Sequence, residues 1–172
     1  MLADDTASFA LVIMRLTLGL MLMTHGVNKI AGSGGIAGTA RWFEALGLRP
    51  GKLHAWLAAM TEIGAGALMV VGLAFPAACA AFVGLMTVAA LTDHRGKGFF
   101  VFKGGWEYTA VVASIATSLA ITGPGRFSLD EAIGIVAHGV GWGLAALLVG
   151  AGAGVGMMMV FCRRPVLTET PA

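Results

Sequence analysis

The chain has 172 residues, of which 58% are hydrophobic and only 12% are charged. Soluble domains carry about 25% charged residues, so this composition, with a mean hydropathy of +0.86, excludes a water-soluble globular protein and predicts an all-α polytopic bundle embedded in a lipid bilayer. The net charge of +2 is too small for a nucleic-acid-binding surface, and we expect no nucleic-acid partner.

Five apolar segments approach or exceed the length needed to cross a membrane. A helix rises about 1.5 Å per residue, so about 20 residues span a hydrocarbon core of about 30 Å. We expect each segment to form a transmembrane helix. The segments are residues 8–29, 54–75, 77–93, 104–122 and 137–161.

The first segment carries charged residues at and near its start. Asp4 and Asp5 stand where a cleaved signal peptide would carry basic residues, and Arg15 interrupts the apolar run. We therefore expect this helix to remain in the mature protein. The connection that follows, residues 31–51, is first rich in glycine and then carries Trp42. Two structures remain open for it, a short helix in the headgroup region and a solvated loop.

The second and third segments share an uncharged stretch that is broken at Gly72 and Pro76. Proline ends one helix and is tolerated in the first turn of the next, so a tight helical hairpin is predicted there. After the fourth segment, the sequence Gly-Pro-Gly at 123–125 predicts a turn. Ser128 and Glu131 follow with the spacing of a capping box, which predicts that a new helix starts at this point.

Lysine and arginine are distributed unevenly over the two ends of a five-span arrangement. One end receives nine of the 11 basic residues, whereas Arg126 alone falls at the other end and Arg15 lies within the first segment. Because positive charges are retained in cytoplasmic loops, we expect the amino terminus outside and the carboxyl terminus in the cytoplasm. The nine residues are Lys29, Arg41, Arg49, Lys52, Arg95, Lys97, Lys103, Arg163 and Arg164.

Two ionisable side chains lie deep in the predicted spans. Such groups are expensive in hydrocarbon, so they tend to face the bundle interior and to pair with one another. Arg15 lies about 10 Å below the outer boundary and Glu62 about 12 Å above the inner one, at about 1.5 Å per residue. A long arginine side chain nearly closes the remaining gap of about 8 Å, which predicts a pair of Arg15 and Glu62. The pair either belongs to an internal site or only fixes helix register.

A second group of polar residues is expected near the inner end. His25 and Lys29 end the first segment at the height expected for His94 and Glu107. If these helices are neighbours, the group forms a site that can bind a polar headgroup or relay protons; alternatively, its charges are solvated at the interface. The four histidines lie on separate segments without a paired spacing such as HxxxH, so no metal site is predicted.

Glycines recur at four-residue spacing in the fifth segment, where Gly139 precedes Gly143 and Gly150 precedes Gly154. Small residues at this spacing allow helices to approach closely in lipid. The neighbouring helix belongs to this chain or to a second chain. We expect the segment to dock a protein partner or a second copy.

From Arg15 to Asp130, about two thirds of the chain, the order of several short motifs resembles the DoxX family of small bacterial membrane proteins. No single motif is specific, but their order is. The motifs are Arg15 with Gly19, Thr24-His25-Gly26 with Lys29, Phe43 with Leu46-Gly47, Glu62 with Gly64 and Gly66, Gly72, His94 with Phe99-Phe100, Glu107, and Gly123 to Asp130.

The resemblance implies a four-helix bundle in the bacterial plasma membrane. It also implies an association with quinone-linked sulfur or thiosulfate oxidation and with defence against oxidative stress, alongside partner proteins. The residues that it places in a polar interior are Arg15, His25, Lys29, Glu62 and Glu107.

The fifth apolar segment is an addition to this four-helix pattern. We therefore divide the chain into a DoxX-like membrane domain (1–131), an additional transmembrane helix (132–162) and a short polar cytoplasmic tail (163–172). An added glycine-rich helix agrees with docking to a partner.

Three classes of function remain open. The first is a redox-linked subunit that binds a quinone or a similar amphipathic molecule among helices one to four, carries no cofactor of its own and works with a membrane oxidoreductase that supplies electrons. The second is a noncatalytic scaffold or assembly subunit of a larger complex. The third, a carrier of small hydrophobic solutes, ranks last because five spans are few and no inverted repeat is convincing.

Overall fold

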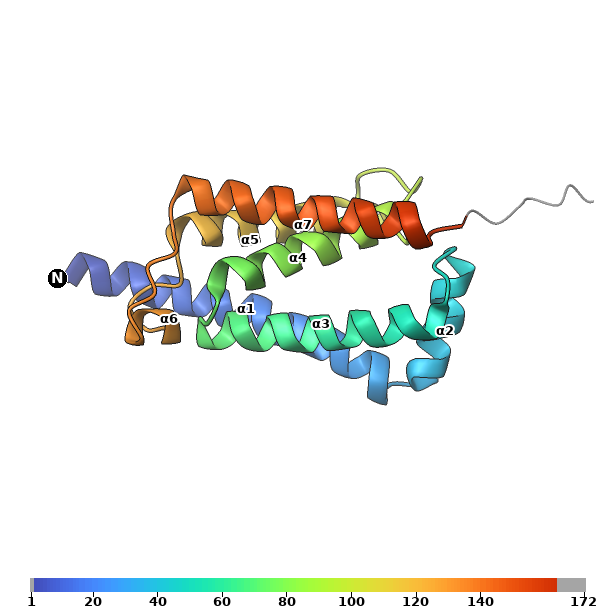
Figure 1. Cartoon of the computed structure of the whole chain (residues 1–172), viewed down its shortest axis with the longest axis horizontal. Coiled ribbons are helices and arrows are strands. Elements are labelled where there is room, and N and C mark those ends of the chain that lie inside the picture. Colours follow the sequence, from blue (N-terminus) through green and yellow to red (C-terminus); the bar gives the residue numbers. More distant parts are fainter. Residues whose placement is uncertain (1, 164–172) are drawn as a thin grey trace, which may run out of the picture.

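The computed structural model describes residues 2–163, which form helices and connecting loops without a strand (Figure 1). The all-α prediction is confirmed. Of the predicted polar tail, residues 163–172, only Arg163 lies among the described residues. The helices are α1 (Leu2–Ala31), α2 (Gly35–Ala45), α3 (Gly51–Val71), α4 (Phe75–Leu91), η1 (Val101–Lys103), α5 (Glu107–Thr122), α6 (Leu129–Ala132) and α7 (Val140–Phe161).

Each of the five predicted spans corresponds to one long helix. α1, α3 and α7 are long and apolar enough to cross a membrane, and α4 and α5 are shorter apolar helices of 17 and 16 residues. At about 1.5 Å per residue the shorter two measure about 25 Å. Alanine, leucine and methionine favour helices, and in lipid a helix satisfies its own backbone hydrogen bonds. The start of α1 and the end of α7 lie at opposite ends of the bundle (Figure 1).

The long connection between the first two spans contains α2, so a short helix is present and the solvated-loop alternative is wrong. The position of this helix in the headgroup region stays a prediction. α2 packs against α3 and buries Ala40 and Phe43. The linker after α2 is tied to the end of α7 by two backbone hydrogen bonds. Arg49 N donates to Phe161 O at 3.1 Å, and Arg163 N donates to Gly47 O at 2.9 Å.

The predicted helical hairpin is present between α3 and α4. Gly72 ends α3 with a φ of 65°, a left-handed conformation that glycine adopts without strain, and Pro76 lies in the first turn of α4. The predicted cap is also present, since Ser128 Oγ accepts a hydrogen bond from Glu131 N at 3.2 Å. It starts only the four-residue α6, however, and the fifth long helix begins at residue 140.

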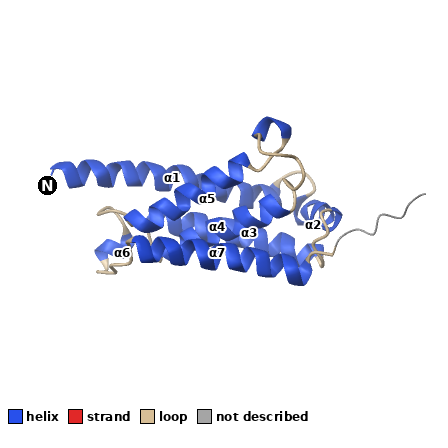
Figure 2. Cartoon of the chain, turned by 90° about the horizontal axis from the view of Figure 1, so that it is seen from above, coloured by secondary structure: helices blue, strands red, loops and turns tan. Residues whose placement is uncertain are grey.

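The helices form two layers. α1 packs against α2 and α3 in one layer, and α4 packs against α5 and α7 in the other. Contacts between α3 and α4 join the layers, and α2 and α6 lie at opposite ends of the bundle (Figure 2). The core combines apolar residues from both layers. Its members include Leu22, Met69, Phe82 and Leu119.

The glycines of α7 serve packing within the chain. A Cβ atom added to Gly143 would overlap the side chain of a residue on α5, and one added to Gly150 or Gly154 would overlap atoms of α4. Gly139 forms the amino-terminal cap of the helix. The expectation that these glycines dock a partner or a second copy is therefore wrong for the three that face α4 and α5, because they hold α7 in its own bundle.

Candidate functional site

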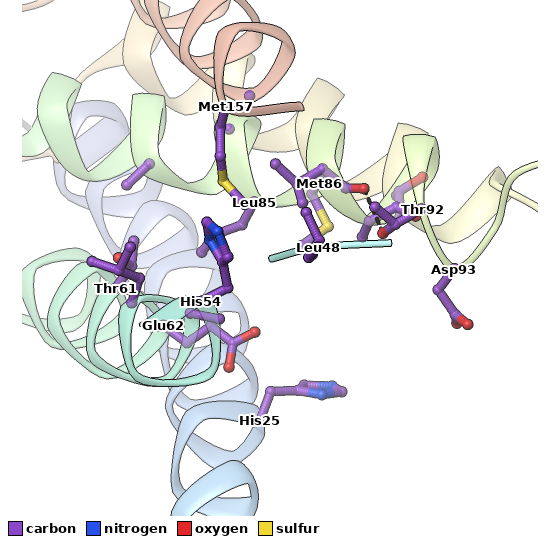
Figure 3. Close-up of a pocket in the computed structure, with 18 of the residues that line it drawn as sticks. His25, Leu48, His54, Thr61, Glu62, Leu85, Met86, Thr92, Asp93 and Met157 are labelled. Carbon is purple, nitrogen blue, oxygen red and sulfur yellow. Dashed lines mark hydrogen bonds between the residues drawn. The ribbon is translucent and has the colours of Figure 1, made fainter. Parts of the chain in front are cut away.

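A cavity of about 540 Å³ lies between the two layers (Figure 3). Trp42 and Phe43 of α2 are among the residues that line it, so it lies in the half of the bundle nearer to α2. Most of its wall is apolar and comes from α1, α3, α4 and α7. The polar side chains in the wall are His25, Lys29, Trp42, His54, Thr61, Glu62, Thr92, Asp93, His94, Tyr108 and Thr109.

An ion pair between α1 and α3 forms the most polar part of the wall. Lys29 Nζ donates to both carboxylate oxygens of Glu62 at 2.7 Å, and the two side chains are only 13% and 10% exposed. The helices approach closely at this level because Gly26 has no side chain; an added Cβ atom would lie 2.8 Å from Ala59 O. Because the pair is partly buried, the attraction between the Lys29 and Glu62 charges is stronger than in water, and removing one partner would leave a charge whose burial destabilises the protein.

Arg15 does not pair with Glu62, so that prediction is wrong. Gly19 and Gly66 set the antiparallel register of α1 and α3, since a Cβ atom on either would lie within 2.7 Å of the other's carbonyl oxygen. This register places Arg15 beside Met69. Glu62 lies seven residues, or about 10 Å, further along α3. The sequence-based estimate measured each residue from a membrane boundary and had no access to the contact between the helices.

The Arg15 side chain is 2% exposed and donates to four backbone carbonyls. Two of these, at the end of α3, belong to Met69 at 3.1 Å and Val70 at 2.7 Å. The other two, before α6, belong to Pro124 and Phe127, each at 2.8 Å. Arg15 is therefore buried in the bundle as predicted, but it lies outside the cavity wall and cross-links the α3 terminus to the segment before α6.

Asp130 complements Arg15 at the same turn. Its carboxylate, in a residue that is 1% exposed, accepts hydrogen bonds from the backbone N–H groups of Ala74 and Phe75 at 2.9 Å, at the start of α4. A cation at the carbonyl end of one helix and an anion at the N–H end of the next are the favourable arrangement for helix dipoles. The sequence marked Asp130 only as the end of a motif and did not indicate this role.

The other predicted site residues divide into two groups. His25 and His94 line the cavity with Lys29 and Glu62. His94 is held by a contact of 2.7 Å between its Nδ1 and Gly104 O in the loop before α5. Glu107 lies outside the wall, where its Oε2 accepts a hydrogen bond from Val101 N at 2.9 Å. The polar group predicted near the inner end therefore lacks Glu107. This residue instead holds the segment before α5 through its hydrogen bond to Val101.

The sequence did not single out His54 as a site residue. It is 1% exposed, lines the cavity, and among the described residues neither of its ring nitrogens has a hydrogen-bond partner. A signal was available, because Ala58, Thr61 and Glu62 follow His54 at spacings of four, seven and eight residues, which place all four on one helix face. That face is the α3 wall of the cavity.

Several lining residues are exposed on the side of the bundle. Leu57 and Thr61 belong to α3, and Val149 and Ala153 belong to α7. These two helices pack mainly against other helices, so the cavity opens sideways between them. Within the described residues, no group of three or more histidine, cysteine, aspartate or glutamate side chains is arranged to hold a metal ion.

Comparison with known proteins identifies the amino-terminal half of the chain. The DoxX family model matches residues 10–95, from the first turns of α1 to the loop after α4. No curated protein and no solved structure matches the chain. The matched segment carries Lys29, His54, Glu62 and His94, whereas the α5 and α7 walls of the cavity lie beyond it.

Proposed function

The chain belongs to the DoxX family, and on that premise we propose that it is an integral membrane protein that binds a quinone or a similar amphipathic molecule between its two helix layers. In this proposal a partner oxidoreductase exchanges electrons with the bound molecule. The observation that carries the proposal is a largely apolar cavity with one buried ion pair, Lys29 with Glu62, in its wall.

The size and chemistry of the cavity support an amphipathic ligand. Ligand pockets enclose about 300–1,000 Å³ and combine apolar walls with a few polar groups that orient the ligand; the value here is about 540 Å³. The Lys29 ammonium has three N–H donors, and two are directed to Glu62. The third is free to donate to a carbonyl or hydroxyl oxygen of a ligand, with Glu62 holding the ammonium in place.

The side opening supports a ligand that arrives through the bilayer. Leu57 of α3 and Val149 of α7 are exposed lining residues on long apolar helices. An opening between such helices faces acyl chains, so a lipid-dissolved molecule can insert its head group while its apolar tail remains between α3 and α7.

Binding is tested with the purified protein in mild detergent and decylubiquinone. Quinones quench nearby tryptophans, and Trp42 lies in the cavity wall, so titration is followed by tryptophan fluorescence. We expect Glu62→Gln to weaken binding about tenfold, the equivalent of about 1.4 kcal/mol. Glu131→Gln, an exposed position at the other end of the bundle, is the matched control and keeps the wild-type affinity. Absence of saturable quenching in the wild type refutes the proposal.

The orientation in the membrane is part of the same proposal. Basic residues cluster at the end of the bundle that carries α2, and Arg126 lies at the other end. With positive charges kept inside, the cluster faces the cytoplasm of the bacterial plasma membrane and the amino terminus lies outside. A fluorescent protein fused to the carboxyl terminus is then active, and a secreted phosphatase fused there is inactive; the reverse pattern contradicts this orientation.

A second candidate, a noncatalytic scaffold, is favoured by the outer face of α7. Gly152 and Gly156 have four-residue spacing, and a Cβ atom added to either meets no atom within 4 Å. This face can therefore receive a helix of another chain. Gly152→Leu in native membranes tests this role. Loss of a stoichiometric co-purifying protein supports it, and an unchanged elution profile of a chain that runs alone removes it.

A further inference from the structure

His54 is a buried polar side chain that the chain itself leaves unsatisfied. Its residue is 1% exposed, and neither Nδ1 nor Nε2 has a hydrogen-bond partner among the described residues. The large majority of buried side-chain polar atoms in proteins do have one. A donor or acceptor buried without a partner destabilises the fold, and His54 lies in the wall of the cavity.

The side chains around His54 do not supply a hydrogen-bond partner for its ring. One side of the ring packs edge-on against Phe161, with centroids 4.9 Å apart, and an aromatic edge offers no hydrogen-bonding atom. Leu48, Leu85 and Met157 line the same part of the cavity, and Figure 3 shows the ring projecting from α3 toward them. These neighbours supply no polar partner, so a molecule in the cavity is the candidate partner of the His54 ring.

We infer that His54 is a binding residue that forms a hydrogen bond with a carbonyl or hydroxyl oxygen on the head group of the cavity's ligand. The inference rests on the proposed function and adds to it the chemistry of the head group. A neutral imidazole carries one donor and one acceptor, so the same residue can hold either a carbonyl or a hydroxyl oxygen.

The second anchor lies on the same helix. His54 and Glu62 are eight residues apart on one face of α3, or about 12 Å along the helix axis, and both line the cavity. Lys29 is held at the Glu62 level. A head group with oxygen atoms on both sides of an apolar ring can contact His54 on one side and the ion pair on the other, whereas a hydrocarbon of the same shape satisfies neither.

A matched pair of ligands tests this role. One ligand is decylubiquinone. The other, the deoxy ligand, is a benzene ring with the same methyl, methoxy and decyl substituents and with hydrogen at the two carbons that carry the carbonyl oxygens of the quinone. We expect the wild type to prefer the quinone at least about tenfold. His54→Phe, which keeps the ring shape and the contact with Phe161, reduces this preference to about threefold or less, while its affinity for the deoxy ligand is unchanged.

The outcomes separate the inference from the proposed function. If the wild type binds neither ligand, the proposed function fails and the inference fails with it. If the wild type prefers the quinone and His54→Phe keeps that preference, the inference alone is overturned. The thermal midpoint without ligand is expected to be unchanged or raised in His54→Phe, because an unsatisfied polar group has been removed; a large fall indicates a purely structural histidine.

A measurement on the wild type covers the case in which the variant does not fold. With ¹⁵N-labelled histidine, one pair of ring-nitrogen signals shifts on addition of decylubiquinone and not on addition of the deoxy ligand. The signals are assigned with His25→Asn, His94→Asn and His138→Asn, which leave His54 as the remaining one of the four histidines. Signals for His54 that stay unchanged with saturating quinone show that water, not ligand, occupies its hydrogen-bonding positions, and this overturns the inference.

Discussion

Substitutions in the ion pair of Lys29 and Glu62 test whether the pair binds a ligand or only fixes the register of α1 against α3. Both side chains are more than four-fifths buried and are joined by two hydrogen bonds of 2.7 Å. Replacing one member of a buried pair leaves an uncompensated charge and destabilises proteins by about 3–5 kcal/mol. We expect Lys29→Met to lower the free energy of unfolding by about 3 kcal/mol, at the lower end of this range because Glu62 borders the cavity and is not fully buried.

Replacing both partners by apolar groups of similar shape is expected to be nearly neutral for stability. The double variant Lys29→Met with Glu62→Met therefore regains most of the stability that the single variant loses. Its affinity for the quinone stays low, because the polar anchor is absent. Stability is measured by unfolding the purified protein from mild detergent into SDS, and affinity by tryptophan quenching.

The result that refutes this reasoning is equally specific. A double variant that recovers both stability and quinone affinity shows that the pair only fixes helix register. A double variant that stays as unstable as Lys29→Met shows that the two residues are not coupled to each other. The control is Lys97→Met, because Lys97 forms an exposed pair with Asp93 at 3.4 Å; such pairs contribute about 0–1 kcal/mol.

Three further predictions concern the scaffold around the cavity and are measured by the same SDS titration or by gel filtration. Arg15→Gln removes charge-assisted hydrogen bonds to buried carbonyls and lowers the free energy of unfolding by about 3 kcal/mol. The control Arg126→Gln, at an exposed position, changes it by less than about 1 kcal/mol. Equal effects of the two variants contradict the role of Arg15 as a buried cross-link. Asp130→Asn weakens the cap of α4 and costs about 1–2 kcal/mol, and an unchanged unfolding curve refutes this role. Gly150→Leu forces α4 and α7 apart, since its Cβ atom would overlap a carbonyl of α4, so the protein aggregates on gel filtration. Gly152→Leu, on the open face of α7, does not aggregate, whether or not a partner protein is lost, and the reverse order contradicts the packing.

The errors in the sequence-based site share one physical origin. Heights along a membrane normal can be counted from residue numbers, but lateral neighbours and register depend on which helix faces pack. Arg15 and Glu62 each turn inward as predicted, yet the contact of Gly19 with Gly66 offsets them. Glu107 was placed at the correct end of the bundle but turns toward the backbone of Val101.

The amino-acid sequence by itself determined the membrane environment, the five apolar helices, the hairpin at Gly72 and the inward position of the buried charges. These features follow from local composition and from the cost of polar groups in lipid, which act on each segment separately. Only the tertiary structure decided that Lys29 is the partner of Glu62, that α7 closes its own bundle, and that His54 is left unsatisfied beside a cavity. Those outcomes depend on contacts between segments far apart in the chain, and no local pattern encodes which pairs of faces meet.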